Sequence, residues 1–439
     1  MRFQGTALLT AAATLLASTH LVQAAPSSLH QQQGRADTIA HSSGEIHLLR
    51  RRAGRKDGVP LHEHLNGERT RLRNKYKGHK ARVAAREAAS EQGQTLESRD
   101  GSTNFGVQTN TLYYAAVTVG TPAKSYPVGI DSGSSDLWIS GQNWNGDSVS
   151  STPADGIFGF GWPTLATGNE DPFWISSGAN VFSMYLASSD DFRNSYAYGG
   201  VINLGQPNSS LYTGSINYVP ITRKVYWTVE LQAFGVGDTQ LQLYQDQPAV
   251  IDSGTSLIGA PDRIVSNFYA SIPNARNVSG SEGFYEYPCS DSNLGIQMTF
   301  GGQAYSIPDA NFVFDQGTDE NYCVGALFGN GEDGTGADQQ FIVGDSFMRG
   351  VYTVFDGPKA SVGFAQLSSS APTTGPDFVA SGSHGSNSNG GSGSGNSGSG
   401  SGGGIFGGAQ SSVPAPRSMV SALLMGGVSV AGAFLVLGA

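Results

Sequence analysis

The alternation of apolar and polar positions predicts a body built almost entirely of β-strands over residues 101–367. Runs such as 112–119 and 352–355 are rich in aromatic and β-branched residues and end at Gly, Pro or Asp, which is typical of strands bounded by turns. Helical periodicity is scarce in this body, and residues 262–272 are its best candidate for a helix. We therefore expect a mostly β fold.

Residues 1–24 have the pattern of a secretory signal peptide. Arg2 precedes an apolar stretch at 7–17, and small residues at positions 22 and 24 form a cleavage pattern. A buried core helix is the alternative, but the segment is not amphipathic and a polar stretch follows at once. We expect a protein that enters the secretory pathway and is exported to the outer side of the plasma membrane or to the cell wall.

The C-terminal part of the chain, 368–439, has the pattern of a flexible linker followed by a membrane-attachment signal. Residues 368–410 form a Gly/Ser-rich linker, which cannot bury enough apolar surface to fold. Within 411–439, the stretch 419–439 carries no charge and follows small residues and a short polar spacer. This is the pattern of a GPI-attachment signal. A retained transmembrane helix is the alternative, since an uncharged apolar stretch of this length can span a bilayer.

Charge is distributed unevenly along the chain, whose net charge is −10. Residues 26–100 contain 15 Lys and Arg against 9 Asp and Glu, whereas residues 101–439 contain 9 against 26. We interpret residues 25–99 as a basic pro-segment that lies along its own acidic body, with a disordered tail that has no partner as the alternative. The acidic body also argues against a nucleic-acid partner, because phosphate binding requires a basic face.

Histidine and cysteine usage excludes several kinds of site. None of the eight His residues falls within 80–383, so an imidazole triad or a His-based metal site cannot lie there. Two cysteines are too few for a disulfide framework or a four-thiolate zinc site, although in a secreted protein they are expected to pair. We expect neither a metal nor a cofactor.

One motif occurs twice in the body. Residues 129–135 read Gly-Ile-Asp-Ser-Gly-Ser-Ser, and residues 250–256 read Val-Ile-Asp-Ser-Gly-Thr-Ser, so that Asp131 and Asp252 hold the same place in each copy. A single Asp-Ser-Gly is often an ordinary turn. Two copies, each after an apolar strand, predict two related lobes that meet at a pseudo-twofold axis.

Such an axis would bring the two aspartates together. Two adjacent carboxylates cannot both ionise and share one proton, so one can act as base on a water while the other donates a proton to a carbonyl. The glycines would let the loops turn tightly beside the carboxylates, and the serines could hydrogen-bond across the axis. The supporting residues are Ser132, Gly133, Ser253, Gly254 and Thr255.

On these residues the body resembles the pepsin-like aspartic proteases. The matching stretches are YYAAVTVGTP (113–122), IDSGSSDLW (130–138), DGIFGF (155–160), AVIDSGTSL (249–257), FIVGDSF (341–347) and YTVFD (352–356). With its signal, basic segment and tail, the whole chain is similar to the fungal GPI-anchored, yapsin-like members. The resemblance implies a bilobal fold with an active-site cleft, an N-terminal lobe at 100–218 and a C-terminal lobe at 219–367. It also implies peptide-bond hydrolysis by Asp131 and Asp252, polypeptide substrates, and a disulfide between Cys289 and Cys323.

The two halves differ in length at one point. The stretch from Asp131 to Gly159 is less than a third as long as the equivalent stretch from Asp252 to Gly344, so the first lobe is shorter than its counterpart. By comparison with the family, the missing part is the β-hairpin flap that closes over the substrate. We therefore expect a truncated first lobe and weak or absent activity for the chain as it stands.

Two functions are compatible with these features. The first is a secreted aspartic endopeptidase made as a zymogen, and the second is a catalytically inactive, surface-anchored protein of the same fold that acts by binding. A purely structural wall protein would leave the duplicated motif unexplained. We expect a monomer, with N-glycosylation of exposed loops at Asn208 and Asn277, where Asn-X-Ser sequons occur.

Overall fold

A computed structural model of the 439-residue chain describes most of the basic segment and the body. The described residues are 36–37, 44–52, 55, 58–91, 111–140, 154–168, 170–188, 197–241, 243, 247–291, 293–331 and 341–373. All of them belong to the first of two compact units, residues 1–383. The predicted signal peptide at 1–24, the region around Arg99 and the predicted linker and tail beyond residue 373 lie outside them. In this described part, no helix is long and apolar enough to cross a membrane.

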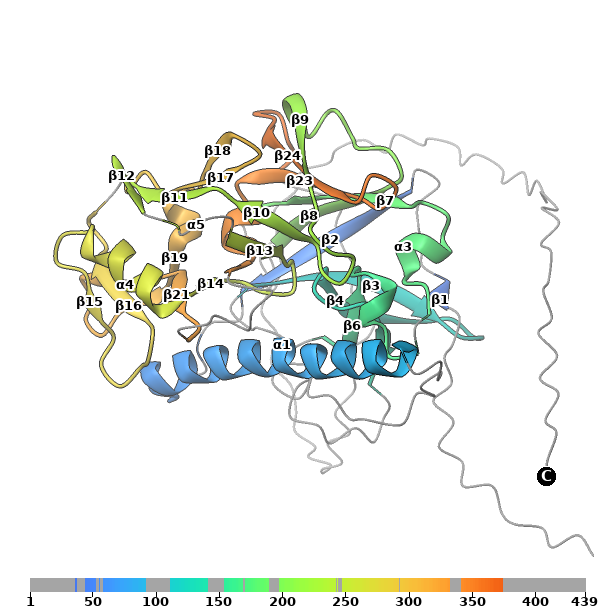
Figure 1. The fold of residues 1–439 in the computed structure, drawn as a ribbon, viewed down its shortest axis with the longest axis horizontal. Helices are drawn as coiled ribbons and strands as arrows, with labels where there is room; N and C mark the ends of the chain where they lie inside the picture. The colour runs from blue at the N-terminus through green and yellow to red at the C-terminus, as the bar shows by residue number, and fades with distance from the viewer. Residues whose placement is uncertain are drawn as a thin grey trace, which may run out of the picture. The chain divides into compact units, whose positions relative to one another are not determined.

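Strands dominate the body, as the sequence predicts. The largest sheet has 11 strands in the order β5-β6-β4-β3-β2-β8-β7-β23-β24-β9, and β1 pairs with β3 outside this path (Figure 1). The bounds are β1 Ala36–Asp37, β2 Glu45–Arg52, β3 Thr111–Val119, β4 Lys124–Asp131, β5 Leu137–Ile139, β6 Gly156–Gly159, β7 Val181–Leu186, β8 Ala197–Leu204, β9 Tyr212–Pro220, β23 Val351–Asp356 and β24 Ser361–Leu367.

Three smaller sheets form the rest of the second half. One holds β10 Thr228–Leu231, β13 Gln247–Ile251, β22 Phe341–Val343, β14 Ile258–Ala260 and β21 Leu327–Gly329. The second holds β12 Thr239–Leu241, β11 Ala233–Val236, β17 Gln297–Phe300 and β18 Gln303–Ser306. The third holds β15 Arg276–Asn277, β16 Tyr285–Pro288, β20 Tyr322–Gly325 and β19 Val313–Gln316. The disulfide between Cys289, which directly follows β16, and Cys323, which lies in β20, is present, with its Cα atoms 5.0 Å apart.

Helices are short, with one exception. Their bounds are α1 Leu61–Glu91, η1 Pro163–Leu165, α3 Phe173–Ser176, α4 Asp262–Ala270, α5 Asp309–Phe312 and α6 Asp345–Met348. Helix α4 forms where the sequence predicts the best helix of the body. The long helix α1 lies in the basic segment, where the sequence pattern predicts none.

The basic segment is part of the fold and not a separate attachment. Its strand β2 lies within the large sheet, where it pairs antiparallel with β3 on one side and with β8 on the other. Strand β2 comes from before residue 100, whereas both of its neighbours come from after it, so the sheet of the first half includes a strand of the basic segment. Strand β2 takes this place because it hydrogen-bonds to the backbone edges of both β3 and β8, which would otherwise lack a partner strand there.

The expected boundary between the lobes is also not a boundary between sheets. Strands β23 and β24 come from the last part of the body, yet they pair with β7 and β9 of the first half. Buried aromatic rings fill the space beside this junction, where the ring centroid of Trp227 lies 5.7 Å from that of Phe182 and 5.2 Å from that of Phe355. The indole of Trp227 also donates a 2.9 Å hydrogen bond to the carbonyl of Phe160. The two halves thus share a sheet and a core.

The site described below is built from two similar units. In the first, β4 lies parallel to β6, and β5 pairs antiparallel with β6. In the second, β13 lies parallel to β22, and β14 pairs antiparallel with β22. The duplicated motif therefore folds into duplicated strand pairs, as the repeat predicts.

The connection that differs in length joins equivalent strands of these units. Between β14 and β22 the chain forms α4, α5 and strands of the smaller sheets, whereas only residues 140–155 join β5 to β6. The described ends of this short connection are held together, because the amide of Ser140 donates a 2.7 Å hydrogen bond to the carbonyl of Asp155. Residues 141–153 lie outside the description.

Candidate active site

Each of the two aspartates ends a buried strand. Asp131 is the last residue of β4, and Asp252 directly follows β13. Both are buried, at 5% and 0% exposure. Because β4 and β13 belong to equivalent units, the structure brings together the two carboxylates that the repeat pairs.

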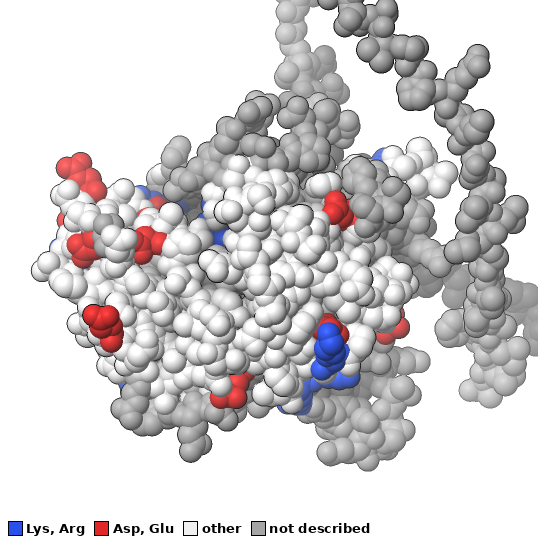
Figure 2. All heavy atoms as spheres, turned by 90° about the horizontal axis from the view of Figure 1, so that it is seen from above, with Lys and Arg blue, Asp and Glu red and all other residues white. Residues whose placement is uncertain are grey.

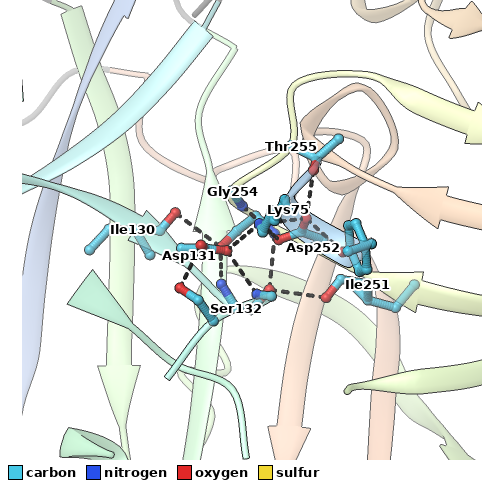
Figure 3. Close-up of polar contacts among 12 residues, drawn as sticks. Lys75, Ile130, Asp131, Ser132, Ile251, Asp252, Gly254 and Thr255 are labelled. Atoms are coloured by element: carbon cyan, nitrogen blue, oxygen red, sulfur yellow. Dashed lines mark hydrogen bonds and ion pairs between the residues drawn. The ribbon is translucent and has the colours of Figure 1, made fainter. Parts of the chain in front are cut away.

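The serines after the aspartates connect the two loops. The Ser132 hydroxyl donates a 3.0 Å hydrogen bond to the carbonyl of Ile251 and accepts one of 2.9 Å from the amide of Ser253 (Figure 3). The Ser253 hydroxyl makes the reciprocal pair, donating to Ile130 and accepting from the amide of Ser132. These four hydrogen bonds across the axis hold the loops in one relative position, so the separation of the carboxylates is fixed by the backbone.

Each carboxylate also receives hydrogen bonds from its own loop. One oxygen of Asp131 accepts from the amide of Gly133 at 2.9 Å and the other from the Ser134 hydroxyl at 2.6 Å. Asp252 repeats this pattern with Gly254 at 3.0 Å and Thr255 at 2.5 Å. The matched donors stabilise ionised carboxylate on either side of the axis.

The two glycines serve a different purpose from the one that the sequence suggests. Neither Gly133 nor Gly254 is among the described residues with positive φ, so the tight-turn argument does not apply. A Cβ on Gly133 would instead stand 2.5 Å from Oδ1 of Asp252, and a Cβ on Gly254 would collide with Asp131. Glycine is required because each loop passes directly against the carboxylate of the other lobe.

Helix α1 closes the site with a lysine. Nζ of Lys75 lies 2.8 Å from Oδ1 of Asp131, and 3.1 and 2.9 Å from the two oxygens of Asp252 (Figure 3). The neighbouring Tyr76 donates a 2.9 Å hydrogen bond from its hydroxyl to Asp252 and packs its ring 5.2 Å from that of Tyr226. Lys75 and Tyr76 are buried, so they fill the space above the carboxylates.

Charge is balanced at this contact. Burial works against the ammonium, but the two carboxylates raise the pKa of Lys75, which therefore stays protonated. Burial raises the pKa of Asp131, although Lys75 opposes the change. Burial also disfavours ionised Asp252, but Lys75 and hydrogen bonds from Asp131 and Thr255 lower its pKa. A pair that keeps one proton and carries one negative charge neutralises the ammonium, which avoids burying net charge.

A second set of contacts holds α1 about two turns before Lys75. The guanidinium of Arg69 pairs with Glu282 and lies 3.6 Å from a carboxylate oxygen of Asp262. One turn earlier, the Asn66 side chain donates a 3.0 Å hydrogen bond to the carbonyl of Gly280. These contacts fix α1 on the second half of the body. At the other end, Figure 1 shows α1 passing beneath β4 and β6.

Lys75 and Tyr76 are functional residues that the sequence pattern does not reveal, for a physical reason. The buried positions of α1 recur with helical spacing, but polar side chains occupy several of them: Leu61, Leu65, Glu68, Arg69, Leu72, Lys75 and Tyr76. A search for an apolar stripe therefore finds no helix. One signal is available, since Tyr76 is the only aromatic residue within 25–99.

The two predicted glycosylation sites differ in exposure. Asn277 is exposed, in the short strand β15 and not in a loop. Asn208 is half-buried, and its side-chain amide donates a 3.3 Å hydrogen bond to Glu45 at the start of β2. Asn208 thus lies in a loop, as expected, but its side chain is only partly exposed while β2 is in place, and its glycosylation stays a prediction.

Comparison with known proteins identifies the class to which this fold and site belong. The family model for eukaryotic aspartyl protease matches residues 112–150 and 140–367, in two segments that overlap within the short connection between β5 and β6. This match includes both Asp-Ser-Gly motifs and more than half of the chain. The chain belongs to the eukaryotic aspartyl protease family.

Among its relatives is an aspartic protease of Phaffia rhodozyma, which is 37% identical over 233 residues, 50% of this chain and 53% of that protein. Major aspartyl peptidase 1 of Cryptococcus neoformans is 29% identical over 336 residues, 58% of this chain and 68% of the relative. Pepsin A of Sus scrofa is 26% identical over 328 residues, 59% of this chain and 82% of the relative. The chain thus spans about half the length of the first of these relatives.

Proposed function

We propose that this protein is an aspartic endopeptidase that is made in a self-inhibited form. The observation that carries the proposal is the pair Asp131 and Asp252, held by matched hydrogen bonds from two equivalent loops. In the proposed reaction, one carboxylate removes a proton from a water as its oxygen attacks the peptide carbonyl carbon. The other carboxyl donates its proton to the carbonyl oxygen, and the C–N bond breaks after the amide nitrogen is protonated.

The basic segment acts as the inhibitor in this proposal. With Lys75 bound to both carboxylates, no water or substrate can occupy the space between them. The segment also supplies β2, so its release exposes the edges of β3 and β8 as well as the cleft. We expect cleavage near Arg99 to produce the mature chain.

The experiment is acidification of the purified chain followed by assay with peptide substrates. We expect acid-range activity for a chain with the missing residues between β5 and β6 restored, and at most weak activity for the chain as written. In either case a pepstatin-type inhibitor should block it, and both Asp131→Asn and Asp252→Asn should abolish it, because neither carboxyl alone can act as acid and base. Asp238→Asn, at an exposed turn, is the matched control and should keep its activity. Equal activity in all four chains would contradict the proposal.

The short connection between β5 and β6 supports a second candidate, an inactive protein of this fold that binds peptides. A cleft without a flap excludes water poorly, and a misplacement of the reacting groups by about 1 Å costs on the order of a hundredfold in rate. We therefore expect the chain as written to be slow or inert, and a chain with the missing residues restored to be faster. If the restored chain is inert as well, the binding function is the better proposal.

We further propose that the protein is a secreted, glycosylated monomer anchored at the cell surface. Figure 2 shows one face of the molecule, where charged side chains are few and scattered and form no basic patch among the described residues. This described face therefore offers no basic surface for a nucleic acid. A phospholipase that cuts GPI anchors should release the protein from cells, and a glycosidase should lower its mass. Persistence of residues 419–439 in the mature protein would instead indicate a transmembrane anchor.

A further inference from the structure

A buried amide near the dyad lacks a side-chain hydrogen-bond partner in the part of the chain that the structure describes. Asn330 directly follows β21 and is 1% exposed, and neither its side-chain oxygen nor its side-chain nitrogen is hydrogen-bonded to a described residue. Its backbone amide is satisfied by a 2.8 Å hydrogen bond to the carbonyl of Ala260. Buried polar atoms that lose their hydrogen bonds to water and gain no partner destabilise the folded state, so this position requires an explanation.

Asn330 lies beside the strand that follows the Asp252 loop. Strand β21 pairs in parallel with β14, with Ala260 opposite Gly329. The nearest atoms to the point where a Cβ on Gly259 would stand are Cδ2 of Leu72 at 3.1 Å, Cζ of Phe328 at 3.5 Å and Nδ2 of Asn330 at 3.6 Å. The space above Gly259, which we call the Gly259 pocket, therefore has one apolar wall and one polar wall.

The Gly259 pocket is filled from α1. Leu72 is 1% exposed and lies three residues, or about one helical turn, before Lys75, which sits on the two carboxylates. The side chain of Leu72 cannot hydrogen-bond, so it leaves the Asn330 amide unsatisfied while α1 is in place. When α1 leaves, the pocket opens next to the catalytic pair and can accept a side chain of a bound peptide.

We propose that Asn330 makes the Gly259 pocket a specificity subsite for a carboxamide side chain of the substrate, glutamine or asparagine. The Asn330 oxygen would accept from the substrate NH₂ group while its nitrogen donates to the substrate carbonyl, which satisfies both atoms at once. Glycine at position 259 leaves room for this contact. A Cβ there would lie only 3.1 Å from Cδ2 of Leu72, so a larger residue would crowd the side chain that fills the pocket. This inference rests on the proposed peptidase function and names its substrate class.

The pairing can be tested in the full-length chain without any activity measurement. Leu72→Gln places a carboxamide in the pocket, and Asn330→Leu removes its partner. The change in Tm caused by Leu72→Gln is measured once in the parent chain and once in Asn330→Leu. We expect it to be more favourable in the parent chain by about 2 °C or more, because only there can the new carboxamide pair with Asn330. Asn267→Leu, on the exposed face of α4, is the matched control and should show no coupling. Strictly additive Tm shifts in both cycles would overturn the assignment of the pocket.

The substrate preference is tested with the acid-activated chain. Peptides that carry either Gln or Leu, at one position at a time on each side of the scissile bond, are compared by kcat/KM. At one position we expect the Gln-to-Leu ratio to fall about tenfold in Asn330→Leu and to stay unchanged in Asn267→Leu. A ratio unaffected by Asn330→Leu at every position overturns the inference. If no peptide is cleaved even by the chain with the missing residues between β5 and β6 restored, the proposed peptidase is overturned instead, and the Tm cycle then still decides whether Asn330 recognises a carboxamide.

Discussion

Nζ of Lys75 lies 2.9 Å from Oδ2 of Asp252, although 177 residues separate the two in the chain. This contact concentrates the attraction between the basic segment and the acidic body at one point. Exposed pairs elsewhere on the surface are screened by solvent and contribute little. A buried lysine on a carboxylate pair is strongly coupled, so its removal has consequences that the net charges do not predict.

Lys75→Met should weaken the contact between α1 and the body. The variant keeps most of the side-chain volume but leaves the buried carboxylate pair without its cation, which costs about 3–5 kcal/mol for a buried pair that loses one partner. In Lys75→Met we expect helix α1 to be cleaved readily at neutral pH, which limited proteolysis measures. Lys77→Met changes an exposed lysine on the same helix and should leave α1 protected. Equal protection in both variants would refute the role of Lys75.

Acid should release α1 from the body. With α1 in place, burial disfavours ionised Asp252, but Lys75 and the hydrogen bonds to this carboxylate lower its pKa, whereas burial raises the pKa of Asp131. Binding of α1 is therefore favoured where Asp252 is ionised and Asp131 keeps the shared proton. This contribution is present above about pH 4, the ordinary range of a carboxyl, and is lost as the pH falls through the lowered pKa of Asp252. The raised pKa of Lys75 implies that binding persists until the pH exceeds about 10.

Hydrogen exchange of the α1 amides, corrected for the intrinsic effect of pH, measures this release. In the parent chain, the α1 amides should be protected at about pH 5 and should lose this protection as the pH is lowered further. In Asp252→Asn it should already be weak at neutral pH, since the charge that holds Lys75 is absent. Protection that is the same in strong acid and at neutral pH would contradict the ion-pair account.

Gly133→Ala should damage the carboxylate pair. The added Cβ would stand 2.5 Å from Oδ1 and 2.7 Å from Cγ of Asp252, so that side chain must move. We expect a loss of peptidase rate on the order of a hundredfold or more. Gly67→Ala is the matched control, because a Cβ there meets nothing within 4 Å, and in a helix it should stabilise by about 0.5–1 kcal/mol. Full activity in Gly133→Ala would show that the loops can move apart.

Loss of the disulfide should destabilise the body without altering the catalytic pair. Cys289 and Cys323 are separated by 34 residues, and closing a loop of that length corresponds to about 3–4 kcal/mol in the chain-entropy model. Denaturant unfolding of Cys289→Ser/Cys323→Ser, compared with the parent chain, measures this difference. Two thiols that titrate in the folded parent protein would disprove the pairing.

The sequence by itself determined the class of fold and the centre of the site. The repeat at Asp131 and Asp252 is local and carries its own strand-then-loop pattern, so it could be read without any knowledge of packing. The same holds for the hydroxyl residues Ser132 and Ser253, whose cross-axis hydrogen bonds follow from the symmetry. The pairing of two cysteines could be expected because there are no others.

Only the tertiary structure decided what occupies the site. Lys75 and Leu72 lie on a helix whose buried face mixes apolar and charged side chains, and a charged side chain is stable there only because its partners come from distant parts of the chain. The place of β2 between β3 and β8, and the burial of the Asn330 amide beneath Leu72, likewise depend on contacts between segments far apart in the sequence. Long-range pairing of this kind leaves no local period in the sequence, which is why the residues that block the dyad appeared only in the folded chain.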